Sequence, residues 1–133
     1  MAEPKKLLIA DDEQQLALAL KIRLESHGYR VVIANDGQQA LELATREKPD
    51  LVILDVLMPV MDGYSCLREL NTRFGRGKIP IIILTARDRM KDLFELEGIE
   101  DYVIKPFDHE DLLLRIDRAF KRRASKTPTA PTP

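Results

Sequence analysis

The sequence is short of several features, and each shortage excludes a class of protein. It has a single cysteine, which cannot form an internal disulfide and fits a reducing compartment. Positive and negative side chains nearly cancel, to a formal net charge of −1, so no overall field attracts nucleic acid or anionic lipid. No apolar run approaches the roughly 20 residues that cross a bilayer, and the first residues lack the apolar segment of a secretory signal. We therefore expect a soluble, cytoplasmic protein without a membrane partner.

Five short apolar runs, each followed by a stretch of helical periodicity, define the expected fold. The runs cover residues 7–10, 31–34, 51–54, 79–84 (interrupted by Pro80) and 102–104. Strands that alternate with helices pair in parallel through right-handed crossovers, with helices on both faces of the sheet. Runs such as 51–54 (LVIL) are apolar on both faces and belong in the middle of such a sheet. We predict an α/β fold with a doubly wound, five-stranded parallel sheet and five helices, of which the fourth (93–97) is the weakest.

The length of 133 residues suits one domain with a proper core. The last expected helix ends in basic residues 121–123, which suit a helix C-terminus. Residues 124–133 (ASKTPTAPTP) contain no core-forming side chain and are typical of a semi-extended segment. We therefore expect one domain over residues 5–123, followed at 124–133 by a natural tail or the start of a linker to an output domain.

Chemically active side chains follow four of the five runs. In an open parallel sheet, ligands bind beyond the carboxyl ends of the strands. Only Asn35 and Asp36 follow the second run, as would suit an edge strand away from the site. The residues that follow the first, third, fourth and fifth runs are Asp11 with Asp12, Asp55, Thr85 and Lys105. Three carboxylates, a hydroxyl and an ammonium are thus expected to converge at one edge of the sheet.

Convergent carboxylates need a counter-charge. Each pair at ~4 Å costs on the order of 4 kcal/mol at an effective dielectric constant of 20, and a hard divalent cation such as Mg²⁺ (or Mn²⁺) relieves that cost. With the metal, a hydroxyl and a fixed cation can neutralise phosphoryl oxygens while a carboxylate attacks phosphorus. Asp55 is the expected nucleophile because it ends the central apolar strand, with acids on one side and Thr85 and Lys105 on the other.

Four motifs in order carry a family resemblance. They are ADDE (10–13), ILDVLMPVMDG (53–63), ILTA (83–86) and DYVIKPF (101–107). Together they resemble the receiver domain of bacterial response regulators, over about residues 5–123. The resemblance implies a flavodoxin-like fold with strand order 2-1-3-4-5. It also implies a two-component phosphorelay, in which a sensor histidine kinase or a histidine phosphotransfer protein is the phosphoryl donor.

The resemblance assigns the metal and the phosphoryl group to named residues. Asp55 would accept the phosphoryl group from a phosphohistidine. Asp12 and Asp55 would bind Mg²⁺ directly, together with the backbone carbonyl of Leu57, and Asp11 would act largely through water. The loop of the long motif, up to Gly63, would present that carbonyl and start the next helix.

Other residues are assigned to holding and sensing the phosphoryl group. Thr85 and Lys105 would contact its oxygens, and Tyr102 would change rotamer with occupancy. The resemblance also implies a cis Lys105–Pro106 bond, although only about 5–6% of such bonds are cis in general. Each residue alone has an ordinary alternative: Asp11 or Asp12 could cap a helix, Thr85 could end a strand, Lys105 could be solvated, and Tyr102 could be packing.

Partner surfaces and departures from the family follow from the same comparison. The kinase would dock near residues 14–18, and a second copy or an output domain would bind the face made by the fourth helix, fifth strand and fifth helix. The segment between Thr85 and Tyr102 is shorter than in most receivers, so the fourth helix should be short or displaced. The resemblance implies that Leu57 and Arg87 occupy positions that tune hydrolysis of the phosphoryl group in the family, and their bulk predicts a long-lived phosphoryl state.

Two other functions fit parts of the pattern. A haloacid-dehalogenase-type phosphatase also forms an aspartyl-phosphate, but it needs a second Asp where this chain has Leu57. A receiver-like module that works without phosphorylation usually lacks one of the acids, the Thr or the Lys, and all are present here. No helix-turn-helix follows, and the basic residues are scattered. We expect a signalling domain rather than an enzyme, catalysing only its own phosphoryl transfer and autodephosphorylation, with no nucleic-acid binding by this chain.

Overall fold

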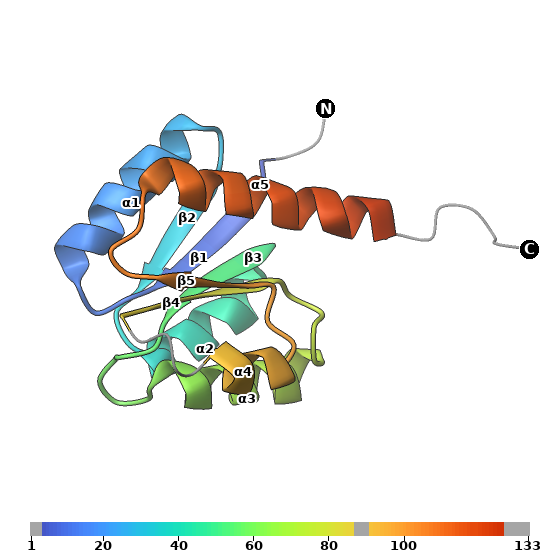
Figure 1. The fold of residues 1–133 in the computed structure, drawn as a ribbon. Helices are drawn as coiled ribbons and strands as arrows, with labels where there is room; N and C mark the ends of the chain where they lie inside the picture. Colours follow the sequence, from blue (N-terminus) through green and yellow to red (C-terminus); the bar gives the residue numbers. More distant parts are fainter. Residues whose placement is uncertain (1–3, 87–90, 127–133) are drawn as a thin grey trace, which may run out of the picture.

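The computed structural model describes residues 4–86 and 91–126, which form one parallel sheet flanked by helices (Figure 1). The strand order is β2-β1-β3-β4-β5, and the predicted fold class and order are confirmed. The elements are β1 (Lys6–Ala10), α1 (Gln14–Ser26), β2 (Arg30–Ala34), α2 (Gly37–Glu47), β3 (Leu51–Asp55), α3 (Gly63–Phe74), β4 (Ile81–Thr85), α4 (Lys91–Leu96), β5 (Asp101–Ile104) and α5 (His109–Lys126).

The sheet separates two apolar layers, because successive side chains of a strand point to opposite faces. Leu7 and Ile9 pack with α1 and α5 on one face, and Leu8 and Ala10 pack with α2, α3 and α4 on the other. Figure 1 shows the same division, with α1 and α5 above the sheet and the other three helices below it. All five residues of both β3 and β4 are buried. The ends of these two central strands therefore form a rigid base for a site.

Local sequence signals set several element ends. Asp36 and Asp62 cap α2 and α3, each accepting a backbone N–H in the first turn. The fourth strand begins at Ile81 and not at residue 79 as predicted. Pro80 explains the difference, because it has no N–H to donate to a ladder. Its carbonyl still accepts the N–H of Val52 at 3.0 Å.

The two last helices depart most from average lengths. Within the described residues, helix α4 has six residues and directly follows the segment 87–90, which lies outside them. Its Phe94 is fully buried, between the rings of Tyr64 (centroids 5.4 Å apart) and Tyr102 (5.8 Å). Helix α5 continues to Lys126, so the first residues of the expected tail, 124–126, are helical, and residues 127–133 lie outside the described chain.

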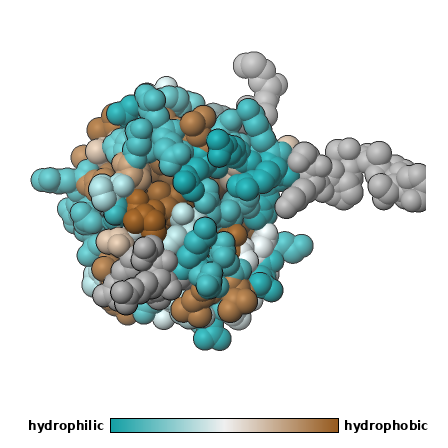
Figure 2. Space-filling view, viewed as in Figure 1, coloured by the Kyte–Doolittle hydropathy of each residue, from teal (hydrophilic) through white to brown (hydrophobic). Residues whose placement is uncertain are grey.

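The surface seen in Figure 2 is mostly hydrophilic, with small hydrophobic patches separated by polar side chains. Within residues 4–86 and 91–126, none of the helices combines the length and the apolar character needed to cross a membrane. Large apolar side chains that reach the surface are Leu18, Ile22, Leu57, Val60, Leu93, Leu96, Ile104 and Leu114.

Candidate phosphoryl-acceptor site

The predicted site residues lie together at the carboxyl edge of the sheet. Asp55 and Thr85 are the last residues of β3 and β4, and Asp11 and Lys105 directly follow β1 and β5. Asp55 pairs in register with Leu84, and Thr85 pairs with Ile104. Because β1, β3, β4 and β5 are neighbours in the sheet, their ends bring the side chains to one place.

The three acids form a compact oxygen cluster. Asp11, Asp12 and Asp55 each offer a carboxylate oxygen, and these oxygens lie within 4.8 Å of one another. Asp11 and Asp55 are buried, with 1% and 4% of their surface exposed, whereas Asp12 is exposed. Hard oxygen donors, part buried and part open to water, suit Mg²⁺, which keeps several waters and takes one or two carboxylates from a protein. The donor set therefore fits a magnesium ion.

Lys105 points into this cluster. Its Nζ lies 3.4 Å from Asp11 Oδ2, 3.4 Å from Asp55 Oδ1 and 3.1 Å from Glu13 Oε1. Burial favours the neutral amine, but the three carboxylates outweigh it and raise the pKa of Lys105. The ammonium is therefore a permanent positive charge beside Asp55. Its backbone N–H donates to the carbonyl of Thr85 at 2.7 Å, which ties the β5–α5 loop to β4.

The surroundings of Asp55 perturb its carboxyl group. Burial, followed by repulsion from Asp11, raises the pKa of Asp55 from 3.8 to about 6, and attraction to Lys105 offsets only part of the rise. Without a metal, the ionised form of Asp55 is therefore less stable than it would be in water. A bound cation would stabilise this ionised form.

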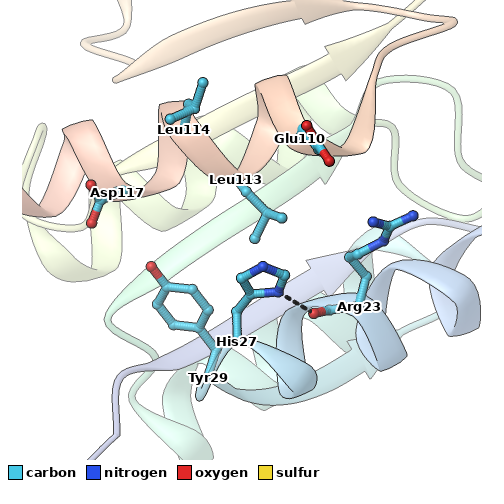
Figure 3. Close-up of a pocket in the computed structure, with 7 residues that line it drawn as sticks. All are labelled: Arg23, His27, Tyr29, Glu110, Leu113, Leu114 and Asp117. Atoms are coloured by element: carbon cyan, nitrogen blue, oxygen red, sulfur yellow. Dashed lines mark hydrogen bonds between the residues drawn. The ribbon is translucent and has the colours of Figure 1, made fainter.

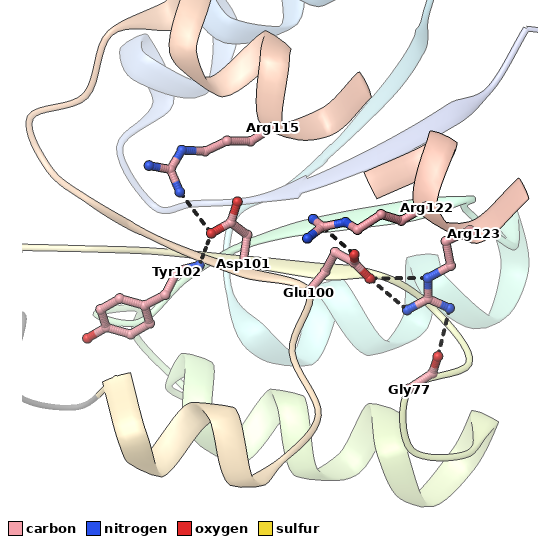
Figure 4. Close-up of polar contacts among 7 residues, drawn as sticks. All are labelled: Gly77, Glu100, Asp101, Tyr102, Arg115, Arg122 and Arg123. Carbon is pink, nitrogen blue, oxygen red and sulfur yellow. Dashed lines mark hydrogen bonds and ion pairs between the residues drawn. The ribbon is translucent and has the colours of Figure 1, made fainter. Parts of the chain in front are cut away.

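Thr85 and Tyr102 lie on the same face of the sheet. Tyr102 pairs in register with Ile83, and Thr85 is two residues further along β4, so both side chains point towards the α4 layer. Both residues are buried. Figure 4 shows the Tyr102 ring on the side of β5 opposite to Asp101.

The loop from β3 to α3 passes close to the site. Leu57 is exposed, with 55% of its surface open. The N–H of Gly63 donates to the Val56 carbonyl at 2.8 Å, and a Cβ at Gly63 would overlap the Asp55 carbonyl and lie 2.7 Å from Val56 Cα. Only glycine therefore allows α3 to start so close to β3. Val60 has φ of +69°, a strained conformation for a β-branched residue.

Three further residues, Pro106, Arg87 and Glu13, differ in how the structure places them. The Lys105–Pro106 peptide bond is cis. Arg87 lies outside the described residues. Glu13 was given no role from sequence, yet it makes the shortest of the three contacts to the Lys105 ammonium. A third consecutive acid after the first apolar run was the only signal for it.

One of two surface grooves lies beside the site, and the other lies elsewhere. The groove beside Lys105, about 380 Å³, is lined by Glu13, Leu16, Ala86, Lys105, Pro106, Phe107 and His109. A groove of about 480 Å³ lies between the end of α1 and α5 (Figure 3). Burial, then Asp117, raises the pKa of Tyr29 there, and His27 contacts the Arg23 carbonyl at 3.0 Å. The clustered acids are not among the residues that line this larger groove, so its size does not mark the site.

The fold and the site define a receiver. The family described as "Response regulator receiver domain" matches residues 7–117, and the chain belongs to that family, whose members act in two-component systems. The predicted identity of the family is thereby confirmed.

Curated relatives are longer proteins. The chain is 45% identical over 124 residues to a probable transcriptional regulator, ycf27, of Guillardia theta, covering 92% of this chain and 47% of the relative. It is 38% identical over 128 residues to the alkaline phosphatase synthesis transcriptional regulatory protein PhoP of Bacillus subtilis, covering 95% and 52%. The chain thus spans about half the length of these relatives.

Solved receiver structures superpose closely. The receiver domain of the Francisella response regulator 1452 has a TM-score of 0.81 at 34% identity, covering 90% of this chain and 98% of that one. The response regulator TrrA of Thermotoga maritima, solved in complex with Mg²⁺ and beryllium fluoride, has a TM-score of 0.78 at 30% identity, covering 86% and 98%.

Proposed function

We propose that the chain is a phosphorylation switch in which Asp55 accepts a phosphoryl group from a phosphohistidine of a sensor histidine kinase or a histidine phosphotransfer protein. The observation that carries the proposal is the position of Lys105 Nζ, 3.4 Å from Asp55 Oδ1 and beside two further acids. A structural ion pair would need one carboxylate, whereas phosphoryl transfer needs a nucleophile, a cation and metal ligands in one place.

In this proposal Asp12, Asp55 and the Leu57 carbonyl hold Mg²⁺ (or Mn²⁺), and Asp11 acts through water. The metal would supply positive charge to the phosphoryl oxygens. An Asp55 carboxylate oxygen attacks phosphorus, the bond to the histidine nitrogen breaks, and that nitrogen keeps the electron pair. Lys105 and the Thr85 hydroxyl then bind the oxygens of the phosphoryl group on Asp55.

The switch follows from the same contacts. A phosphoryl group on Asp55 draws the Thr85 hydroxyl towards it, and Tyr102 moves into the space that opens on the α4 side. Because Tyr102 packs against Phe94 of α4 at 5.8 Å, its rotamer biases the position of that helix. The result is a population shift between two surfaces rather than a new fold.

Two surfaces suit the expected partners. Leu18 and Ile22 expose apolar side chains on α1, the helix that follows Asp11 and Asp12 in the chain, and the phosphoryl donor would dock near residues 14–18 of that helix. The face of α4, β5 and α5 exposes Leu96 and Ile104 and would bind an output domain or a second copy of the chain. Light scattering before and after phosphorylation tests the second copy: a doubling of mass supports it, and an unchanged mass rules it out.

That second face also carries a group of ion pairs, drawn in Figure 4. Asp101 pairs with Arg115 at 2.8 Å, and Glu100 pairs with Arg122 and with Arg123, each at 3.1 Å. Partly exposed pairs of this kind contribute little to stability. Their exchange for contacts across an interface would therefore cost little, which suits a surface whose partner changes.

The proposal is tested by intact-mass spectrometry after incubation with acetyl phosphate and Mg²⁺. We expect the wild type to gain one phosphoryl group and Asp55→Asn to gain none. Asp117→Asn, which removes an exposed carboxylate of α5 that pairs with Lys121, is the matched control and should be phosphorylated like the wild type. Repeated turnover of small phosphate esters would instead favour the phosphatase, and no gain of mass would favour a module that works without phosphorylation.

The lifetime of the phosphoryl group is a separate expectation. Leu57 is exposed beside Asp55, where its bulk would hinder an attacking water, and Arg87 is expected to add to this effect. We propose that the phosphorylated form decays slowly. Loss of the added mass within seconds of removing acetyl phosphate would contradict this, and Leu57→Asn should shorten the lifetime.

A further inference from the structure

Glu13 occupies a helix N-cap without capping the helix. It directly precedes α1, but its side chain makes no hydrogen bond to the first turn, although N-cap side chains commonly accept one. The carboxylate instead turns to the sheet edge and accepts from Lys105 Nζ at 3.1 Å. The Glu13 carboxylate is therefore directed at the site and not at the helix.

The contacts of the Lys105 ammonium are unequal. Glu13 is closer to it, at 3.1 Å, than Asp11 and Asp55, at 3.4 Å each. The Glu13 side chain is 62% exposed, whereas Asp11 and Asp55 are buried. Of the three acids that contact the ammonium, Glu13 is the one exposed to solvent, so it can release the ammonium at least cost.

The backbone of Glu13 is fixed by the site itself. Its N–H donates to Asp11 Oδ1 at 2.9 Å, and its carbonyl accepts the N–H of Ala17 at 3.0 Å, which begins α1. The first buried acid therefore determines where the Glu13 side chain starts. Its reach to Lys105 is a consequence of the turn between β1 and α1.

We propose that Glu13 is a positioning residue, which holds the Lys105 ammonium at the mouth of the site and competes for it with the phosphoryl group on Asp55. The inference rests on the proposed function, because it presumes that Lys105 contacts the phosphoryl oxygens. Phosphorylation would place anionic oxygens next to Lys105, which then leaves Glu13. The Glu13 contact is therefore lost on activation and favours the unphosphorylated state.

The consequence is a gain of affinity when the Glu13 carboxylate is removed. Beryllium fluoride with saturating Mg²⁺ serves as the probe, because it forms a phosphoryl-like group on a carboxylate. An exposed ion pair contributes less than about 1 kcal/mol, so Glu13→Gln should tighten the binding of the probe about two- to fivefold. A ¹⁹F NMR titration measures the bound fraction directly.

A second variant separates the effect of the Glu13–Lys105 contact from the effect of the negative charge at position 13. Glu13→Asp keeps the charge but shortens the side chain by one carbon–carbon bond, roughly 1.5 Å, which breaks the contact at 3.1 Å. We expect Glu13→Asp to tighten binding in the same direction as Glu13→Gln. The control is Glu47→Gln, which removes an equal charge and an ion pair with Lys6 at 3.0 Å, at an acid outside the metal cluster, and should bind the probe like the wild type.

The outcomes are distinct. Unchanged affinity for the probe in Glu13→Gln overturns the inference. Tighter binding in Glu13→Gln together with wild-type binding in Glu13→Asp also overturns it, because that pattern reports the charge alone and not the contact. A purely structural role would change the urea midpoint and leave the affinity for the probe unmoved. Absence of binding by the wild type would overturn the proposed function itself.

Discussion

Replacing Asp55 by asparagine should stabilise the metal-free protein. Burial and Asp11 raise the pKa of Asp55 from 3.8 to about 6, after the attraction of Lys105 is included. Each factor of ten in proton affinity is worth about 1.4 kcal/mol, so the ionised carboxylate costs the native state about 3 kcal/mol. The native state binds the Asp55 proton more tightly than the unfolded chain does, so the contribution of Asp55 to wild-type stability falls as pH rises from about 4 to about 6. The amide side chain of the variant does not titrate, so this loss is absent from it.

The assay is urea unfolding in EDTA at pH 4 and pH 7.5. We expect Asp55→Asn to exceed the wild type by up to about 3 kcal/mol at pH 7.5, with the difference shrinking towards pH 4. Added Mg²⁺ should stabilise the wild type by mass action and the variant much less. A variant that is no more stable at pH 7.5, or whose advantage is the same at both pH values, would refute the account of Asp55 as a carboxylate held ionised at a cost.

Three further substitutions test the frame around the site. Val60→Gly should raise the free energy of unfolding by about 1 kcal/mol, because it removes a side chain from a positive-φ position. Val60→Ala keeps a Cβ, so an equal gain in stability from Val60→Ala would contradict the reasoning. Gly63→Ala should lower stability by about 1–3 kcal/mol and weaken Mg²⁺ binding, because its Cβ would meet the backbone of Asp55 and Val56; unchanged binding in a calorimetric titration would show that the loop tolerates the shift. Phe94→Ala should cost about 3–5 kcal/mol by urea unfolding, because it empties a fully buried position between two tyrosines; a loss near zero would mean that α4 is not packed as described.

Much of the fold could be predicted because its signals are local. The residues of β3 and β4 are apolar on both faces, which only a central position satisfies. The predicted run began at residue 79, but β4 begins at Ile81, because Pro80, which interrupts that run, cannot donate to the hydrogen-bond ladder. The end of α5 at Lys126 was missed because nothing in residues 121–126 stops a helix, and the composition of the following residues suggested an earlier end.

The site was predictable in its residues but not in its contacts. Parallel topology alone brings the ends of β1, β3, β4 and β5 together, so Asp11, Asp55, Thr85 and Lys105 could be grouped from sequence. Which acid lies closest to the Lys105 ammonium depends on the turn after β1 and on side-chain rotamers, which periodicity does not encode. Glu13 was missed for that reason. The strain at Val60 was also hidden, because a positive φ at a β-branched residue contradicts its local preference.

Metal-assisted phosphoryl transfer to Asp55 can be tested by mapping the phosphorylated residue, with acetyl phosphate as the donor and borohydride reduction to mark the acyl phosphate. We predict a single reduced residue at position 55, formed with Mg²⁺ and absent in EDTA. A mark on Asp11, Asp12 or any other residue, or equal labelling without the metal, would contradict the account.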